Sequence, residues 1–225
     1  MKRYLPFVIV GAVALLTVGG GALLYHAKRP AALSIPKNRE KSGLDQSTHV
    51  RGNPKAPITL EEFGDFECPP CAKLAPVITQ IERDYGQDLR VIFHHFPLMV
   101  HAHARQAAFG AEAAGLQNRF WEMHDLLYRE QAVWSKAVDV RPLFNAYAGM
   151  LGLNIDRFEK DMESDQVKSR VSSDEKRANE IGVTTTPTVF INNRAVAPPS
   201  LNDAGLRSAI SAIKEAGAQP KEKPK

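Results

Sequence analysis

The chain has 225 residues, of which 44% are hydrophobic, and it carries 29 basic and 25 acidic side chains. The basic excess lies near the start, because residues 1–50 contain 7 basic and 2 acidic residues whereas residues 51–225 contain 22 and 23. The larger part therefore lacks the basic surface that nucleic-acid binding requires, and we expect no nucleic-acid partner. It is also long enough to form one domain with its own core.

The first 27 residues have the pattern of a membrane anchor. Residues 5–25 are a run of 21 without a charged side chain, long enough as a helix to cross a hydrocarbon core of about 30 Å. A cleaved secretory signal is the alternative, but its apolar region is usually about 7–15 residues long and small residues mark its cleavage site. Leu24-Tyr25-His26-Ala27 fits such a site poorly. We expect a membrane anchor or uncleaved signal over residues 1–27 and a linker over residues 28–50.

The charges around this run do not settle its orientation. Lys2 and Arg3 precede it, but five basic residues between Lys28 and Lys41 follow it, and the positive-inside rule would then keep the domain in the cytoplasm. We favour the opposite orientation because the chain has only two cysteines, close together, with no third thiol to misoxidise. We expect a single-pass protein of the inner or cytoplasmic membrane whose large domain is periplasmic or extracellular.

From residue 51 onward, hydrophobic periodicity and turn residues predict an α/β domain. The expected elements are a strand at 58–66, a helix at 69–85, a strand at 89–96, helices throughout 101–182, strands at 187–191 and 195–197, and a helix at 202–216. A tight turn at Asn192-Asn193 joins the last two strands. The order β-α-β, helical insertion, β-β-α predicts one domain over 51–218, with an insertion at about 100–182 and a disordered tail over 219–225.

The only two cysteines, Cys68 and Cys71, lie where the first strand gives way to the helix. A thiolate at a helix start is acidified by free backbone N–H groups and by the helix dipole, and a thiol one turn later can close a disulfide. A structural disulfide is an alternative, but closing so short a loop contributes little stability. Zinc is another, although it would need two histidines as further ligands. We favour a redox pair.

Four histidines could supply those ligands: His94, His95, His101 and His103. His94 and His95 are adjacent on a predicted strand, so they point to opposite faces and cannot both bind one ion. His101 and His103 stand where the insertion begins, and we expect hydrogen bonds at a helix end or in the core from them. The sequence predicts no metal site, and no cofactor other than a redox-active Cys68–Cys71 disulfide.

Four blocks of the sequence, at residues 52–60, 62–71, 95–98 and 182–192, together resemble the DsbA-type thiol-disulfide oxidoreductases. In that family a helical domain splits a thioredoxin-like core, and the resemblance covers about residues 50–217. It implies disulfide exchange, in which Cys68 is the exposed nucleophile that forms a mixed disulfide with the substrate. Cys71, deeper in the first helical turn, would then resolve that disulfide.

The resemblance also implies roles for residues outside the pair. Pro187 would be a cis-proline facing the disulfide, with Thr186 pairing with an extended substrate peptide and with Pro69-Pro70 on the substrate side. An ordinary trans proline at the start of an edge strand is the alternative for Pro187. Glu62 would be a buried acid that takes the proton of Cys71, and a solvent-facing strand glutamate is the alternative.

The residues beside Cys68 bear on the direction of electron flow. Pro70 removes a backbone N–H, neither proline supplies a protonatable ring, and Glu67 adds a negative charge. We therefore expect Cys68 to be less acidic than in a strongly oxidising relative, and the pair to be a milder oxidant.

The favoured hypothesis is a monomeric oxidase for exported proteins, reoxidised by a quinone-linked membrane partner. The expected linker is too short to form a dimerisation domain. A reductase or isomerase of the same fold is one alternative, and a non-catalytic anchored peptide-binding or chaperone domain is another.

Overall fold

The computed structural model describes residues 49–218. The expected anchor over 1–27, almost all of the expected linker over 28–50, and the expected tail over 219–225 lie outside the described residues. Among the helices at 49–218, none is both long and apolar enough to cross a membrane.

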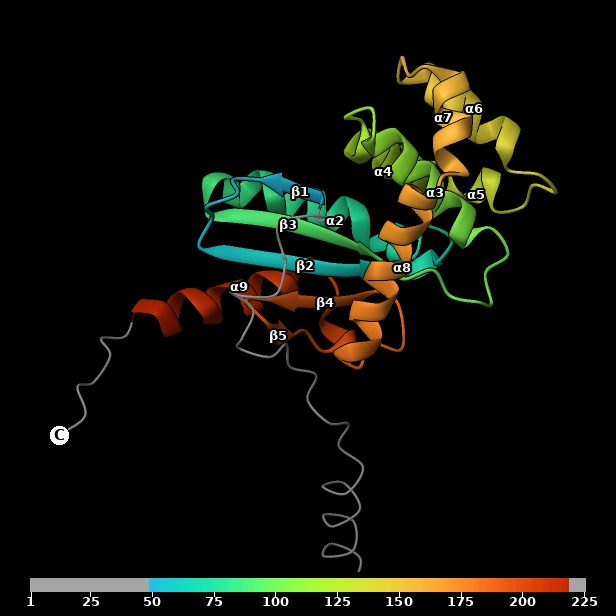
Figure 1. Ribbon diagram of the computed structural model, residues 1–225. Helices are drawn as coiled ribbons and strands as arrows, with labels where there is room; N and C mark the ends of the chain where they lie inside the picture. Colours follow the sequence, from blue (N-terminus) through green and yellow to red (C-terminus); the bar gives the residue numbers. More distant parts are fainter. Residues whose placement is uncertain (1–48, 219–225) are drawn as a thin grey trace, which may run out of the picture. The chain divides into compact units, whose positions relative to one another are not determined.

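A mixed five-stranded sheet forms the centre of the described part (Figure 1). Its strands are β1 (His49–Gly52), β2 (Ile58–Gly64), β3 (Leu89–His95), β4 (Thr188–Ile191) and β5 (Arg194–Ala195). Their order across the sheet is β1-β3-β2-β4-β5, with β2 and β3 parallel and the other neighbours antiparallel. All seven residues of the central strand β2 are buried, because helices cover both faces of the sheet.

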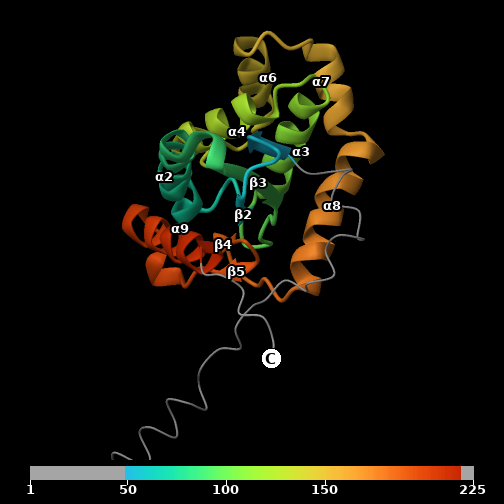
Figure 2. The ribbon, with the colours of Figure 1, turned by 90° about the vertical axis from the view of Figure 1, so that its left-hand side faces the viewer.

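Two helices cover one face of the sheet and one covers the other, as Figure 2 shows. On the first face lie α2 (Pro69–Tyr85) and α9 (Asp203–Ala218), and on the second lies α8 (Asp165–Glu180). The inner side of α2 presents apolar residues at three- and four-residue spacing, which pack with β2 and α9. These side chains are Leu74, Ile78 and Ile81 from α2, Leu60 from β2, and Leu206 and Ile210 from α9. Burial of each contributes roughly 1.5–3 kcal/mol, which fixes the position of α2 on the sheet.

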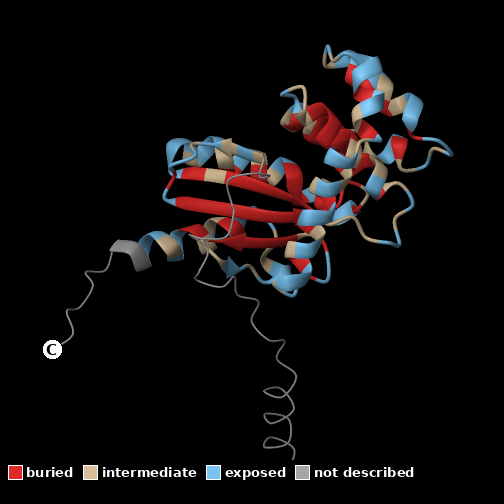
Figure 3. Cartoon of the chain, in the orientation of Figure 1, coloured by how far each residue is buried: buried red, intermediate tan, exposed pale blue. Residues whose placement is uncertain are grey.

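The helical insertion occupies the chain between β3 and β4. Its helices are α3 (Ala104–Gly115), α4 (Phe120–Arg129), α5 (Gln131–Trp134), α6 (Arg141–Met150), α7 (Ile155–Met162) and α8. Trp134, Phe144 and Phe158 are fully buried in its core. Figure 3 shows where the buried residues lie, in the strands and on the inward sides of the helices. The three aromatic side chains belong to one apolar cluster with Phe66, Phe93 and both cysteines, so the core of the insertion continues into the surroundings of the cysteine pair. α8 carries the chain back across the sheet.

The order and type of the expected elements agree with the sequence-based prediction, whereas several limits differ by one or two residues. The strands expected at 58–66, 89–96, 187–191 and 195–197 are found at 58–64, 89–95, 188–191 and 194–195, and the helix expected at 202–216 is found at 203–218. The predicted tight turn is confirmed, since Asn192 and Asn193 have φ values of 45° and 66°, the left-handed values that asparagine tolerates in a two-residue hairpin turn.

The prediction of a linker as far as Val50 is wrong, because His49 and Val50 belong to β1. β1 is a four-residue edge strand with half-exposed residues, and such a segment has the polar composition of a linker. It is held by β3 and by side chains distant in the sequence. The His49 ring lies 2.9 Å from Glu112 Oε1 in α3, and Arg51 donates to Asp125 in α4 at 3.0 Å.

Candidate active site

The cysteine pair lies at the beginning of α2, four residues after the end of β2. Cys68 precedes the first helical residue and has extended backbone angles, φ −74° and ψ 119°. Pro69 and Pro70 form the exposed first turn and have no N–H to offer. The first helical N–H available to the Cys68 sulfur is that of Cys71, and it does form a hydrogen bond there. The two prolines thus leave one backbone donor where other residues would supply more.

The two thiols are in very different environments, although both are free. A hydrogen bond from the Cys71 thiol is the largest influence on Cys68 and lowers its pKa, and the Thr186 side chain and the Cys71 backbone act in the same direction. Burial and the charge of Asp65 oppose them, and the pKa of Cys68 falls from 9.0 to about 6. Burial raises the pKa of Cys71, and the Cys68 hydrogen bond and the Glu62 charge raise it further. Cys68 is therefore the more acidic thiol and Cys71 the thiol that keeps its proton.

The expectation that Cys68 is exposed is wrong for the protein without a bound substrate. The exposed fraction of Cys68 is 4%, and that of Cys71 is 0%. Part of the cover comes from the insertion, because the Gln131 side chain in α5 donates to the carbonyls of Phe66 (2.6 Å) and Cys68 (3.0 Å). Sequence reasoning missed Gln131, which lies 63 residues from Cys68 and belongs to no local motif.

The peptide bond between Thr186 and Pro187 is cis, as the resemblance implied. The Cys68 thiol donates to the carbonyl oxygen of Thr186 across a distance of 3.4 Å. Thr186 is 7% exposed, and Pro187 directly precedes β4, the neighbour of β2 in the sheet. The structure thus brings together two predicted site residues, Cys68 and Thr186, that lie 118 residues apart in the chain.

Glu62 is buried in β2 and not solvent-facing. Its exposed fraction is 2%, and its Oε1 has no hydrogen-bond partner among the described residues. Burial raises its pKa from 4.5 to about 8, with Arg51 opposing this shift and Cys68 adding to it. Its charge acts on Cys71, whose pKa it raises. A carboxyl that gains and loses a proton near neutral pH therefore lies within electrostatic reach of both cysteines.

A second buried acid near the cysteines is Asp65, to which the sequence analysis assigned no role. Its side chain is 0% exposed, and Oδ2 lies 2.7 Å from Nδ1 of His101. Oδ2 also accepts from the backbone N–H of Leu98 at 2.8 Å, and Oδ1 from that of Glu67 at 2.7 Å. Asp65 therefore joins the segment before Cys68 to the loop after β3. The expectation that His101 forms a hydrogen bond at a helix end or in the core is confirmed, since its partner is this buried carboxylate.

Two other histidines that could have served as metal ligands, His94 and His95, contact separate acids. His94 lies between Glu61 and Asp174, both 2.9 Å away, whereas His95 lies 2.9 Å from Glu112. The two rings therefore point to opposite faces of the sheet, as predicted. Within residues 49–218 no three His, Cys, Asp or Glu side chains form a group that could hold a metal ion.

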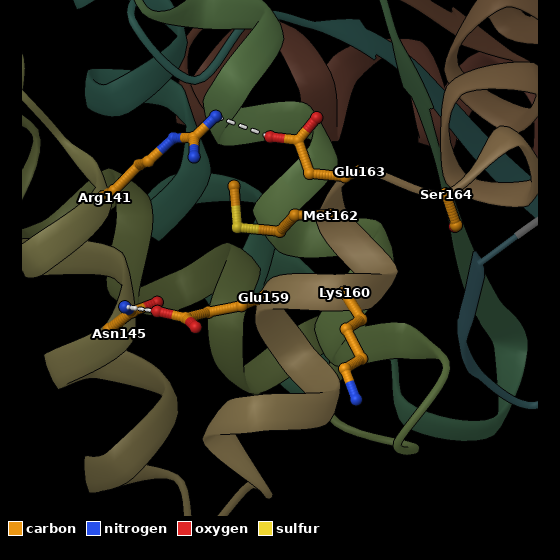
Figure 4. Close-up of a pocket in the computed structure, with 7 residues that line it drawn as sticks. All are labelled: Arg141, Asn145, Glu159, Lys160, Met162, Glu163 and Ser164. Atoms are coloured by element: carbon orange, nitrogen blue, oxygen red, sulfur yellow. Dashed lines mark hydrogen bonds and ion pairs between the residues drawn. The ribbon is translucent and has the colours of Figure 1, made fainter.

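A hollow between α6 and α7, shown in Figure 4, lies apart from the cysteine pair in the chain. Two pairs of side chains bridge it: Arg141 with Glu163 at 2.5 Å, and Asn145 with Glu159. None of its lining residues belongs to α2, to the loop after β3, or to the segment around Pro187. It is therefore no part of the candidate site.

Comparison with known proteins agrees with this geometry. A family model described as thioredoxin matches residues 44–212. The chain belongs to the thioredoxin family. A curated relative, the Na(+)/H(+) antiporter NhaA 1 of Mycolicibacterium gilvum, is 40% identical over 151 residues, or 65% of this chain and 23% of the antiporter. This thioredoxin-family chain thus spans less than a quarter of that relative.

Solved structures place the thioredoxin-family chain among proteins with the DsbA-type fold. BdbD from Bacillus subtilis is 21% identical, with a TM-score of 0.70 over 83% of this chain and 100% of BdbD. DsbA2 from Pseudomonas aeruginosa is 24% identical, with a TM-score of 0.61 over 85% of this chain and 99% of DsbA2. The predicted resemblance is therefore confirmed at the level of the fold, a thioredoxin-like core interrupted by a helical insertion.

Proposed function

We propose that this protein is a membrane-tethered, extracytoplasmic thiol-disulfide oxidoreductase that acts on exported proteins through Cys68 and Cys71. The observation that carries the proposal is the geometry of Cys68. Its acidified thiol directly precedes α2 and donates to the carbonyl of the residue before a cis-proline. A stable thiolate is both a good nucleophile and a good leaving group near neutral pH, and disulfide exchange requires both properties.

The exchange follows from the different acidities of the two thiols. In the reducing direction, the Cys68 thiolate attacks a substrate disulfide, forms a mixed disulfide and releases one substrate thiolate. Cys71 then loses its proton to Glu62 and attacks the Cys68 sulfur, which frees the second substrate thiolate and forms the Cys68–Cys71 disulfide. In the oxidising direction the same steps run backwards, and Cys71 leaves as a thiolate that takes its proton from Glu62.

Substrate would bind as an extended peptide beside Thr186 and Pro187. In the free protein the Cys68 thiol occupies the Thr186 carbonyl. Once Cys68 is a thiolate, it no longer donates, and that carbonyl is free to accept an N–H from the substrate backbone, as in strand addition.

The surface around the pair suits unfolded or flexible substrates. Met99 and Val100 in the loop after β3 are 102% and 84% exposed, and Val133 and Val138 near α5 are 56% and 102% exposed. Both segments are tied to the residues around Cys68, since Gln131 donates to Cys68 O and the Leu98 backbone N–H donates to Asp65. The His103 ring joins the two segments to each other through the Ala137 carbonyl. Exposed apolar side chains of this kind bind apolar segments of other chains.

We infer that the pair acts as a mild oxidase and is reoxidised by a quinone-linked membrane partner. The support is the Pro69-Pro70 dipeptide, which leaves Cys68 one helical N–H and no ring, together with the 21-residue apolar run at 5–25. A reductase or isomerase is the second candidate, and the same dipeptide favours it because fewer donors stabilise the thiolate less.

Two measurements on the full chain in detergent test these proposals. Rapid alkylation of the reduced protein near neutral pH, lost in the Cys68→Ser variant, is expected for a catalytic pair, and an unreactive pair would leave only a peptide-binding or chaperone role. Redox titration against glutathione then gives the direction: a potential well above that of thioredoxin, about −270 mV, indicates an oxidase, and one near or below it a reductase.

A reporter that is active only in the periplasm, fused after Lys225, tests the location. Reporter activity is expected if the domain is exported. A fusion that is expressed but inactive would place the domain in the cytoplasm and exclude a role in the folding of exported proteins.

A further inference from the structure

The carboxylate of Asp65 creates an electrostatic problem for the Cys68 thiolate. Asp65 lies three residues before Cys68, its side chain is 0% exposed, and its backbone carbonyl accepts from Cys68 N at 3.1 Å. Its negative charge raises the pKa of Cys68. The other acidic residues of this region, Glu62 and Glu67, cannot neutralise the charge of Asp65. Glu62 lies beneath the pair, and Glu67 is held in place by the His103 backbone N–H at 2.6 Å.

The imidazole ring of His101 lies beside the Asp65 carboxylate and can neutralise its charge. Nδ1 of His101 lies 2.7 Å from Asp65 Oδ2, and the His101 side chain is 21% exposed, so it exchanges protons with solvent while its partner is buried. The contact joins the loop after β3 to the segment before α2. His103, two residues further on, turns away from Asp65: its ring contacts Gln106 and the carbonyl of Ala137.

We propose that His101 sets the acidity of Cys68 through Asp65. The protonated imidazole and the carboxylate form a neutral pair, so the Cys68 thiolate develops beside no net charge; when the imidazole is neutral, the thiolate faces an uncompensated anion. The proposal rests on the redox role of Cys68 proposed above. In this proposal the loop after β3 supplies a positively charged histidine near the nucleophile, which the Pro69-Pro70 dipeptide cannot do.

The electrostatics of the loop agree with this geometry. Partial burial alone would lower the pKa of His101, but the hydrogen bond and charge of Asp65 outweigh it, and Cys68 and Glu67 add to the rise above 6.5. Coupling between two titrating groups is reciprocal. If the Cys68 thiolate favours the charged form of His101, then charged His101 favours the Cys68 thiolate by the same free energy.

The test measures the Cys68 pKa from the ultraviolet absorbance of the thiolate in the reduced full chain. In His101→Gln we expect a rise of about 0.5 to 1, the size expected for one charge near a protein surface. His101→Lys keeps the charge and should keep the Cys68 pKa low. His103→Gln is the matched control, because its ring does not contact Asp65, and it should leave that pKa unchanged.

The double variant Asp65→Asn/His101→Gln removes both charges and should restore the wild-type Cys68 pKa, which a merely structural role of His101 would not do. If His101→Gln and His103→Gln give the same Cys68 pKa, the proposal is overturned.

A second measurement uses a variant expected to leave the loop intact. The His101 pKa, followed by NMR, should be lower in Cys68→Ser than in the reduced wild type, because the thiolate is gone. An unchanged His101 pKa would contradict the coupling. This outcome is distinct from failure of the proposed function: absence of disulfide exchange would remove the enzyme while leaving both pKa values measurable.

Discussion

On the α8 face of the sheet, Glu61 lies 2.9 Å from the His94 ring and accepts from Arg177 at 2.8 Å. On the α2 face, its neighbour Glu62 has no bonded cation, and its Oε1 lacks a partner among the described residues. Both side chains are buried, with residue exposures of 1% and 2%. Alternation along one strand thus places two identical side chains in opposite electrostatic environments.

The difference distinguishes a carboxylate that is bonded to cations, Glu61, from one that has no bonded cation among the described residues, Glu62. Burial alone would lower the pKa of His94, but hydrogen bonds to Asp174 and Glu61 raise it, so this face holds a charged network. Burial without a bonded cation raises the pKa of Glu62 to about 8. Two carboxyl groups in such different environments usually have different tasks. Here one holds α8 on the sheet and the other lies beneath the cysteines.

The largest expected effect is on stability as a function of pH, and it comes from Glu62. Because its pKa is about 8 when folded and 4.5 as a free group, the folded state holds the proton more tightly. The contribution of Glu62 to stability is then fully present below pH 4.5 and is lost as the pH rises through 8, by at most about 5 kcal/mol. Glu62→Gln should lack this loss. Urea unfolding of the reduced protein from about pH 5 to about pH 9 measures it, and parallel curves for the variant and wild type would contradict it.

Removal of Glu61 should have the next largest effect, on stability alone. Glu61→Gln leaves His94 and Arg177 with one charged partner fewer, and breaking a buried ion pair from one side costs about 3 kcal/mol. Urea unfolding near neutral pH measures the loss. The contrast between the two faces also requires that mixed-disulfide resolution stay at the wild-type rate in this variant. If Glu61→Gln slowed resolution as much as Glu62→Gln, the two faces would not be separate.

Glu62→Gln should slow resolution of the mixed disulfide about 100-fold, or about 2.7 kcal/mol in activation free energy, because Cys71 loses its proton acceptor. The first attack by Cys68 should be nearly unchanged, since its thiolate is already formed near neutral pH. Stopped-flow mixing with a disulfide peptide, followed by acid quenching, separates the two steps. A wild-type rate of resolution would remove Glu62 from the mechanism.

The residues at the centre of this site could be predicted from the sequence. The CxxC at a strand-to-helix junction follows from a short motif, whereas the cis-proline and the buried Glu62 were expected only because the sequence resembles the DsbA-type family. The partners that set the charges could not be predicted in this way. Arg177 meets Glu61 from 116 residues away, and His101 meets Asp65 from 36 residues away, so only the folded arrangement of α8 and the loop after β3 brings them together.

Two predictions from the sequence were wrong for the same reason: the linker as far as Val50 and the exposed Cys68. β1 has few apolar residues of its own, and long-range contacts of its side chains to α3 and α4 help to hold it at the edge of the sheet. Cys68 is covered in part by Gln131 of the insertion. In both cases the evidence is a tertiary contact, and no local pattern of residues encodes it.

Pro70→His should give the smallest of these effects. It would place a histidine near an anion on the cysteine face, as is already the case on the α8 face. The substitution restores a backbone N–H and adds a protonatable ring at an exposed position, and both stabilise the Cys68 thiolate. We expect a reduction potential higher by about 30 mV, a tenfold change in the exchange equilibrium. Pro70→Ala is the matched control, because it restores the N–H without the ring. If Pro70→Ala gives the whole rise, the N–H alone is responsible; an equal or lower potential in Pro70→His would mean that the dipeptide does not make this pair a mild oxidant.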